Sequence, residues 1–271
     1  MFEKVKYAFF DLDGTLVPEG KTISTKTQMA FSYLKSLGIK VGIATGRSPY
    51  FVKPLADLLH PNLPYVCING AQILDVNFKT ISEKLFPKSA YQVFDILNNK
   101  KIDFLIYSNE GVFFSDISHP FRQRLWKMFS VLKFNQDFKF DVNQDLSFYK
   151  NKDFYKVLIS FKNDEEKSNI ESIIKDFNEV TYASSQSNVL DIYSKLADKA
   201  LGIEYVSKIL NISNDEIIVF GDNENDINMF KKFKNSVCLK NAKDYVKVNA
   251  KFTTDFDCAN DGVADFIFKN F

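Results

Sequence analysis

The 271-residue sequence has few of the residues that form disulfide frameworks or zinc sites. Its three cysteines, Cys67, Cys238 and Cys258, are an odd number, lie far apart and lack the paired spacing of a metal motif. This pattern is typical of reduced thiols. The two histidines, His60 and His119, each precede a proline in turn-like sequence. We therefore expect neither a disulfide-stabilised fold nor a zinc centre.

An excess of charge of one sign and long hydrophobic runs are also absent. The 35 Lys and Arg residues nearly balance the 34 Asp and Glu residues, so the overall charge indicates neither a nucleic-acid nor a membrane partner. No apolar stretch is long enough to span a bilayer, and acidic residues interrupt the N-terminal run where a signal peptide would have its core. We expect a cytoplasmic globular protein with one large domain or two ordinary ones.

The stretch "YAFFDLDGTL", residues 7–16, runs from apolar and aromatic residues directly into two acids. Asp11 and Asp13 are two positions apart, so on an extended strand they would begin on the same face. Two carboxylates that close raise each other's pKa unless a cation or a hydrogen-bond donor offsets them. A divalent metal is the simplest such cation. An Asp-Gly turn after a strand explains this stretch equally well by itself.

Strand and helix patterns alternate in the first third of the chain. A strand at 7–13 is followed by a helical pattern at 25–38 and by further apolar runs at 39–47 and 65–75. Strand–helix–strand order favours a parallel sheet with helices on both faces. In the third apolar run, Asn69 precedes a glycine, which predicts a hairpin turn.

The middle of the chain has a different pattern. From about residue 86 to 188, aromatic-rich strands alternate with helices, and two strands around "SNEG" indicate antiparallel pairing. We predict a Rossmann-like, doubly wound, mostly parallel α/β core formed by residues 1–85 and 189–271. Residues 86–188 would form an inserted α+β domain. No G-x-G-x-x-G follows the first strand, so a dinucleotide is not the expected ligand.

Polar residues follow the ends of three separate apolar runs. They are Asp11 with Asp13, then Thr45, then Asp222 with Asn225 and Asp226. Ligands of open α/β sheets bind beyond the carboxyl ends of the strands, so we expect these residues to converge. An EF-hand is excluded, because Ile227 and Phe233 stand where that loop needs glycine and glutamate.

The expected chemistry of such a site is phosphoryl transfer. A small number of oxygen ligands suits Mg²⁺, which keeps several waters and often binds beside phosphate. An aspartate next to that ion can attack phosphorus to give an acyl-phosphate, which water then hydrolyses.

The segments "DLDGTL", "ATGR" and "GDNENDINM" resemble motifs I, II and IV of the haloacid dehalogenase-like superfamily. "INGAQILD" is similar to the Cof-type phosphatases, which carry a large inserted α/β cap of the C2B type. The resemblance covers nearly the whole chain in motif order. It implies a Mg²⁺-dependent phosphatase that hydrolyses small phosphomonoesters, such as sugar phosphates or other phosphorylated metabolites, through an aspartyl-phosphate. The cap would exclude bulk water and select the leaving group.

The resemblance also implies roles for individual residues. Asp11 would be the nucleophile and a metal ligand. Asp13 would be the general acid and base, with its backbone carbonyl on the metal. Thr45 would donate to the transferring phosphoryl group, and Asp222 would complete the metal ligands. The implied partner is a small phosphorylated metabolite, with no nucleic acid and no membrane, and we expect a monomer or small homo-oligomer.

The remaining motif positions are assigned to binding. Asn225 and Asp226 would orient the phosphate and the metal shell, and Gly46 would lie at the phosphate. Arg47 and Asn69 are expected at the edge of the site. A surface arginine and a hairpin asparagine are the competing interpretations of these two residues.

The third motif needs a lysine near the start of the helix that precedes the last motif strand. We assign Lys199, because its distance before "IIVFGD" fits and Lys195 lies too close to the strand "VLDIY". The family usually has Lys-Gly here, whereas Lys199 precedes Ala200. A lysine at a helix N-terminus is unfavourable unless an anion, such as a phosphate, lies nearby.

Two other functions remain open from the sequence. A phosphomutase of the same superfamily would transfer the phosphoryl group to a second hydroxyl without net phosphate release. A non-catalytic phosphometabolite-binding protein would keep the site without turnover. The presence of Asp11, Asp13, Lys199 and Asp222 argues against the binding protein, because a site that only binds has no need of an acid/base residue.

Overall fold

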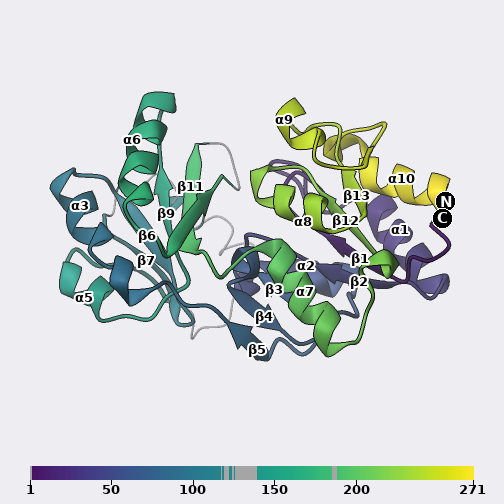
Figure 1. Cartoon of the computed structure of the whole chain (residues 1–271), viewed down its shortest axis with the longest axis horizontal. Helices are drawn as coiled ribbons and strands as arrows, with labels where there is room; N and C mark the ends of the chain where they lie inside the picture. Colours follow the sequence, from purple (N-terminus) through teal and green to yellow (C-terminus); the bar gives the residue numbers. More distant parts are fainter. Residues whose placement is uncertain (1, 117, 119–121, 124, 126–138, 185–187) are drawn as a thin grey trace. The chain divides into compact units, whose positions relative to one another are not determined.

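The chain forms two compact units in the computed structural model (Figure 1). The described residues are 2–116, 118, 122–123, 125, 139–184 and 188–271, so His119 lies outside them. The core unit consists of Met1–Glu83 and Ala197–Phe271. The inserted unit is Lys84–Leu196.

The core unit is built on a parallel sheet of five strands with β1 next to its edge strand β2. Every neighbouring pair in this sheet is parallel. In spatial order the strands are β14 (Phe252–Thr253), β13 (Asn235–Cys238), β12 (Ile217–Gly221), β1 (Tyr7–Phe10) and β2 (Lys40–Ile43). The predicted mostly parallel α/β core is confirmed.

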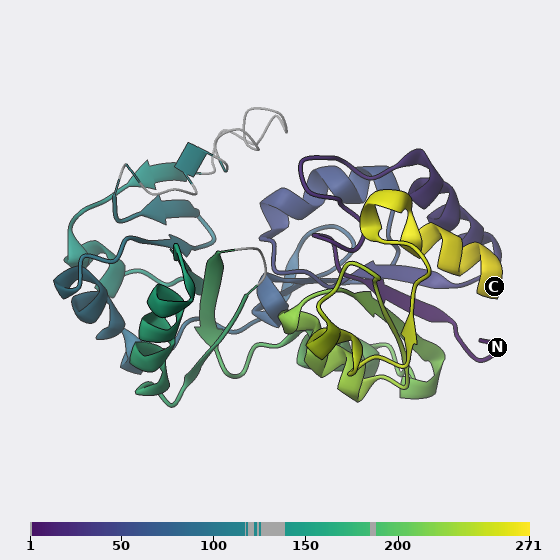
Figure 2. The same cartoon turned by 90° about the horizontal axis from the view of Figure 1, so that it is seen from above.

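Helices cover both faces of this sheet, because successive residues of its central strands are apolar and point to opposite faces. Phe10 packs against Phe31 of α1, whereas Phe9 lies in a cluster with Ile203 of α7 and Met229 of α8. Figure 2 shows α1 and the yellow α10 on one side and the green α7 and α8 on the other. The helices of the core unit are α1 (Thr25–Ser36), α2 (Pro49–Leu59), α7 (Lys199–Ile209), α8 (Ile227–Lys232), α9 (Asp244–Lys247) and α10 (Gly262–Asn270).

A small antiparallel sheet completes the core unit. It consists of β3 (Tyr65–Cys67), β4 (Gln72–Leu74) and β5 (Thr80–Glu83). The turn between β3 and β4 confirms the predicted hairpin, with Asn69 at φ 53° and Gly70 at φ 87°. Short 3-10 helices occupy Ile68–Gly70, Lys88–Ala90, Asn214–Glu216, Glu224–Asp226 and Cys258–Asn260.

The inserted unit is an α+β unit with a six-stranded sheet. Its strands pair antiparallel, except that β7 and β8 are parallel. In spatial order they are β10 (Val180–Ala183), β11 (Val189–Ser194), β9 (Lys156–Ser160), β6 (Phe104–Tyr107), β7 (Gly111–Phe114) and β8 (Lys139–Val142). Its described helices are α3 (Val93–Asn99), α5 (Leu146–Lys150) and α6 (Asp164–Lys175). The antiparallel pair around "SNEG" is confirmed as β6 and β7.

The boundaries between the units differ from the predicted ones. Residues 189–196, which the sequence assigned to the core, lie in the inserted unit. The reason is β11, which pairs antiparallel with β9 and β10 rather than joining the parallel sheet. At the first crossing the inserted unit begins at Lys84 rather than at residue 86. Within the described part of the chain, no helix has the length and apolar character that crossing a membrane requires.

Phe10 tests how strongly core packing stabilises β1. Its ring is fully buried, with centroids 4.6 Å from the rings of both Phe31 and Phe220. We expect Phe10→Ala to lower the free energy of unfolding by about 3–5 kcal/mol, because the truncation leaves a cavity. Urea unfolding followed by circular dichroism measures the change. The control Phe268→Ala, at a ring 43% exposed, should cost about 1 kcal/mol or less. Equal losses in the two variants would contradict this account.

Candidate active site

Three loops at one edge of the parallel sheet carry the predicted site residues. Asp11 follows β1, Thr45 follows β2, and Asp222 follows β12. These strands are parallel neighbours, so their carboxyl ends lie at the same edge. The structure therefore brings together residues that are separated by up to more than three quarters of the chain.

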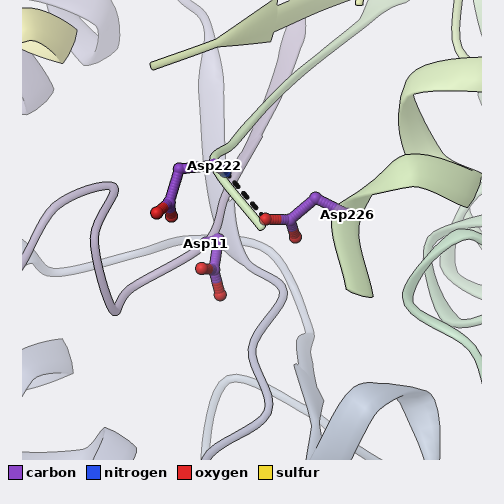
Figure 3. A group of neighbouring side chains, drawn as sticks. All are labelled: Asp11, Asp222 and Asp226. Carbon is purple, nitrogen blue, oxygen red and sulfur yellow. Dashed lines mark hydrogen bonds between the residues drawn. The ribbon is translucent and has the colours of Figure 1, made fainter. Parts of the chain in front are cut away.

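An acidic cluster lies at this edge. Asp11, Asp222 and Asp226 each place a carboxylate oxygen so that all three oxygens lie within 4.8 Å of one another (Figure 3). Asp11 is 4% exposed and Asp226 is fully buried. Asp222 is half-buried, and such a set of carboxylate oxygens can hold a hard divalent cation. The Asp13 carboxylate is not part of this cluster.

Lys199 supplies the positive charge of the cluster. Its Nζ donates to Asp11 Oδ1 and to Asp226 Oδ1, both at 2.7 Å, and the side chain has no exposed surface. Asp198 caps the N-terminus of α7 by accepting from the backbone N–H of Ala200 at 2.7 Å. The carboxylates of Asp11 and Asp226 thus provide the negative charge that a lysine at the N-terminus of a helix requires.

Lys195, the rejected alternative, belongs to the inserted unit. Its backbone N–H donates to the carbonyl of Glu179 at 2.9 Å. The structure therefore places Lys199 and not Lys195 at Asp11.

Burial and mutual repulsion shape the protonation of these groups. Burial, reinforced by Asp226, raises the pKa of Asp11 to about 7 although Lys199 opposes the shift. Burial and the neighbouring carboxylates of Asp11 and Asp226 likewise raise the pKa of Asp222 well above its usual range. Burial disfavours the Lys199 ammonium, but the two carboxylates outweigh it and raise the pKa of Lys199. Three carboxylates share one ammonium, so the cluster favours a further cation.

Asp226 is fixed by the loop that it closes. Its Oδ2 accepts from the backbone N–H groups of Asp222 and Asn223 at 2.8 and 2.9 Å, while its Oδ1 accepts from Lys199. Gly221 makes this close approach possible, because a Cβ there would lie 2.4 Å from Asp226 Cγ. Because both of its oxygens accept hydrogen bonds, Asp226 holds Lys199 and the backbone of the loop that carries Asp222 in position.

Asp13 points to Arg47 instead of the acidic cluster. The guanidinium donates from Nε to Asp13 Oδ2 at 2.8 Å and from Nη2 to Asp13 Oδ1 at 2.6 Å. The Arg47 side chain is only 14% exposed, so the interpretation as a surface arginine is wrong. Thr45 is fully buried, and its Oγ1 accepts from the backbone N–H of Arg47 at 3.2 Å across Gly46.

Two asparagines from different loops meet beside the cluster. Asn225 Nδ2 donates to Asn69 Oδ1 at 2.9 Å, and Asn69 is 1% exposed. Among the described residues, neither the Asn69 Nδ2 nor the Asn225 Oδ1 has a hydrogen-bond partner, although both atoms are buried. Unpartnered buried polar atoms cost free energy. These two atoms are therefore suited to a polar ligand.

Two residues at the site had not been singled out from the sequence. Thr15 Oγ1 donates to Asp222 Oδ1 at 2.8 Å, and Asn241 Nδ2 donates to Asp222 Oδ2 at 3.1 Å. Thr15 lies inside "DLDGTL", two positions after Asp13, so its place in the motif could have suggested it. Asn241 lies in a turn after β13 with no motif around it.

Comparison with known proteins places these features in a wider group. A family model for haloacid dehalogenase-like hydrolases matches residues 8–267. A Mycoplasma genitalium protein assigned by name to the phosphatases is 29% identical, and the match covers 98% of each chain. Two 5-amino-6-(5-phospho-D-ribitylamino)uracil phosphatases of Bacillus subtilis are 29% and 26% identical. Those matches cover 97% of this chain in both cases, and 97% and 94% of the relatives.

Solved structures share the fold. A haloacid dehalogenase-like hydrolase of B. subtilis superposes with a TM-score of 0.85 at 21% identity, covering 98% of this chain and all of that one. The sugar phosphatase BT4131, described as subclass IIB, superposes with a TM-score of 0.82 at 22% identity, covering 98% of each chain. At these identities the likeness establishes the fold.

The raised pKa of Asp11 predicts a pH-dependent response to a divalent cation. In the metal-free folded state the pKa of Asp11 is about 7, above its ordinary value of 3.8. Between these two pH values the folded state keeps a proton on Asp11 that the unfolded state has lost, so the free energy of unfolding falls as the pH rises through this range. A cation needs the ionised form. We expect saturating Mg²⁺ to raise the unfolding temperature by about 5 °C or more at about pH 8 and by much less at about pH 5. Equal shifts at both pH values in differential scanning fluorimetry would contradict the assignment.

Proposed function

The chain belongs to the haloacid dehalogenase-like hydrolase family, and we propose that it hydrolyses small phosphomonoesters with Mg²⁺ through an aspartyl-phosphate at Asp11. Family membership and the phosphatase class, both predicted from the motifs, are confirmed by the matched family and by the phosphatase relatives. One observation carries the mechanistic proposal. The Asp11 carboxylate is held by Lys199 inside a buried acidic cluster at the carboxyl edge of the sheet.

The donor set fits Mg²⁺, because it consists of oxygen atoms only, with Asp11 buried and Asp222 half-buried. Asp11, Asp222 and the backbone carbonyl of Asp13 would hold the ion. Asp226 would not bind the ion directly but would orient the groups that do, since its oxygens already accept from Lys199 and two backbone N–H groups. When bound, Mg²⁺ acts as a Lewis acid that neutralises charge on the phosphoryl oxygens.

Asp11 and Asp13 divide the covalent chemistry. A carboxylate oxygen of Asp11 attacks phosphorus, which forms an acyl-phosphate and breaks the bond to the leaving oxygen. Asp13 gives a proton to that leaving oxygen. It then takes a proton from the water that attacks the acyl-phosphate and restores Asp11. Lys199 keeps Asp11 oriented through both steps.

Arg47 controls when Asp13 is available. Both oxygens of Asp13 accept from its guanidinium, so proton transfer to a leaving oxygen requires Arg47 to move aside. A phosphate bound at the edge of the site provides a second anion for Arg47. Thr45, Gly46, Asn69 and Asn225 complete the proposed phosphate site. The Asn69 Nδ2, which has no partner within the described part of the chain, is a donor for it.

The proposed substrates are phosphorylated sugars, polyols and related metabolites. This proposal draws on relatives named as phosphatases of a phosphoribitylamino compound and on a structural neighbour described as a sugar phosphatase. We assign selection of the leaving group to the inserted unit, acting as a cap. The three buried free thiols support the reducing environment of a cytoplasmic protein.

The nucleophile is tested with Asp11→Asn. We expect this variant to lose Mg²⁺-dependent phosphate release from a panel of sugar and polyol phosphates by at least about 10³-fold, because an amide does not attack phosphorus. The matched control is Asp57→Asn on α2, where the carboxylate is exposed and pairs only loosely with Lys53 at 3.8 Å. Its activity should equal that of the wild type. A fully active Asp11→Asn would refute the mechanism, and phosphoryl transfer to a second hydroxyl without release would indicate a mutase.

The acid/base role is tested with Asp13→Asn. We expect phosphate release from alkyl phosphates to fall by about 10²–10⁴-fold. With p-nitrophenyl phosphate, whose leaving group needs no proton, the first step should continue while hydrolysis of the intermediate slows. Rapid-quench experiments should then show a burst of p-nitrophenol and a phosphorylated protein. Equal slowing for both substrate types, with no burst, would remove Asp13 from this role.

A further inference from the structure

Asn241 joins three loops that lie far apart in the chain. Its Nδ2 donates to Asp222 Oδ2 at 3.1 Å and to the backbone carbonyl of Gly14 at 2.9 Å. Its Oδ1 accepts from the backbone N–H of Cys258 at 2.9 Å. A single amide offers two N–H donors and an acceptor, so this side chain can serve all three contacts at once.

The first contact fixes the carboxylate of Asp222. Thr15 Oγ1 donates to its Oδ1 at 2.8 Å and Asn241 donates to its Oδ2, so each oxygen has a donor from a different loop. Each carboxylate oxygen accepts more than one bond, which leaves capacity for a cation. The two donors therefore set the rotamer of Asp222 and still leave its carboxylate oxygens able to bind a cation.

The second contact fixes the backbone that follows Asp13. The N–H of Gly14 donates to the carbonyl of Val17 at 3.0 Å, and its C=O accepts from Asn241. The Gly14 N–H belongs to the same peptide plane as the Asp13 carbonyl, so its bond to Val17 fixes the direction of that carbonyl. The bond from Asn241 holds the next peptide plane, that of the Gly14 carbonyl, and so limits rotation of the backbone at Gly14. Gly14 also packs directly on Asp222, since a Cβ at this φ of 78° would lie 2.2 Å from Asp222 Oδ2.

The third contact anchors Asn241 itself. Cys258 begins a 3-10 turn that Asp257 caps by accepting from the backbone N–H of Asn260 at 2.9 Å. The C-terminal turn thereby holds the amide plane of Asn241 against the two loops of the site.

We propose that Asn241 is a positioning residue for the metal site. It presets the Asp222 carboxylate in the orientation that binds Mg²⁺ and holds the backbone at Gly14, which follows the Asp13 carbonyl, and this inference rests on the proposed function. Asn241 touches neither Asp11 nor Lys199 in the described contacts, so it acts on cation affinity and not on the attacking group.

The test measures Mg²⁺ binding by isothermal titration calorimetry on the full chain, for wild type, Asn241→Ala and Asn235→Ala. Asn235 is a matched control, because its Nδ2 also donates to two backbone carbonyls. These are the carbonyls of Asp215 and Ile217, each at 3.2 Å. We expect Asn241→Ala to raise the Kd for Mg²⁺ about 10-fold or more. Asn235→Ala should leave the Kd unchanged.

Phosphate release provides the second measurement. Asn241→Ala should need more Mg²⁺ for half-maximal rate, yet at saturating Mg²⁺ its kcat should return to within about twofold of the wild type. A purely structural role would lower the unfolding temperature and leave the Kd for Mg²⁺ unchanged, which would overturn the proposal. A fall in kcat that Mg²⁺ does not restore would also overturn it.

Two outcomes keep this inference separate from the proposed function. If the wild type itself binds no Mg²⁺, the proposed function fails and the role of Asn241 fails with it. If the wild type binds Mg²⁺ and Asn241→Ala binds it equally well, only the role of Asn241 fails. Because Asn241 is exposed, its truncation leaves no internal cavity, and Asn241→Ser carries the same prediction if the alanine variant does not fold.

Discussion

The buried ammonium of Lys199 is the constraint on which the site depends. It has no exposed surface, and it donates to the carboxylates of Asp11 and Asp226, which balance its charge. A buried charge is tolerated only when oppositely charged, hydrogen-bonding groups surround it. The loop after β1, the loop after β12 and the start of α7 must therefore meet. The parallel order of β12 and β1 and the packing of α7 on their shared face provide that meeting.

The arrangement also explains why one site suits both a cation and an anion. Three carboxylates and one ammonium leave an excess of negative charge, which favours a divalent cation. Beside them lie Arg47 and the amide nitrogen of Asn69, which has no partner among the described residues, and both groups are suited to an anion. A phosphate ester with Mg²⁺ satisfies both requirements. Donors from Thr15 and Asn241 prearrange Asp222, so less reorganisation is needed when the ion binds.

Sequence patterns predicted the fold well where the signal is local. The first strand, the helix that begins at Thr25 and the hairpin at Asn69 follow from apolar periodicity and turn chemistry, although the strand ends at Phe10 and not at the predicted Asp13. The second domain boundary was wrong because β11 is an ordinary apolar strand in isolation. Only its antiparallel partners, β9 and β10, show that it belongs to the inserted unit. No local pattern states which strand another strand will pair with.

The sequence by itself determined the family, the α/β class and the acids at the strand ends, because each of these is carried by neighbouring residues in a short motif. Tertiary structure alone decided that Asp13 pairs with Arg47, that Lys199 bridges Asp11 and Asp226, and that Asn241 reaches Asp222. These contacts join residues that are distant along the chain. Their geometry exists only after the loops have closed, and loop closure depends on the packing of the whole sheet and its helices.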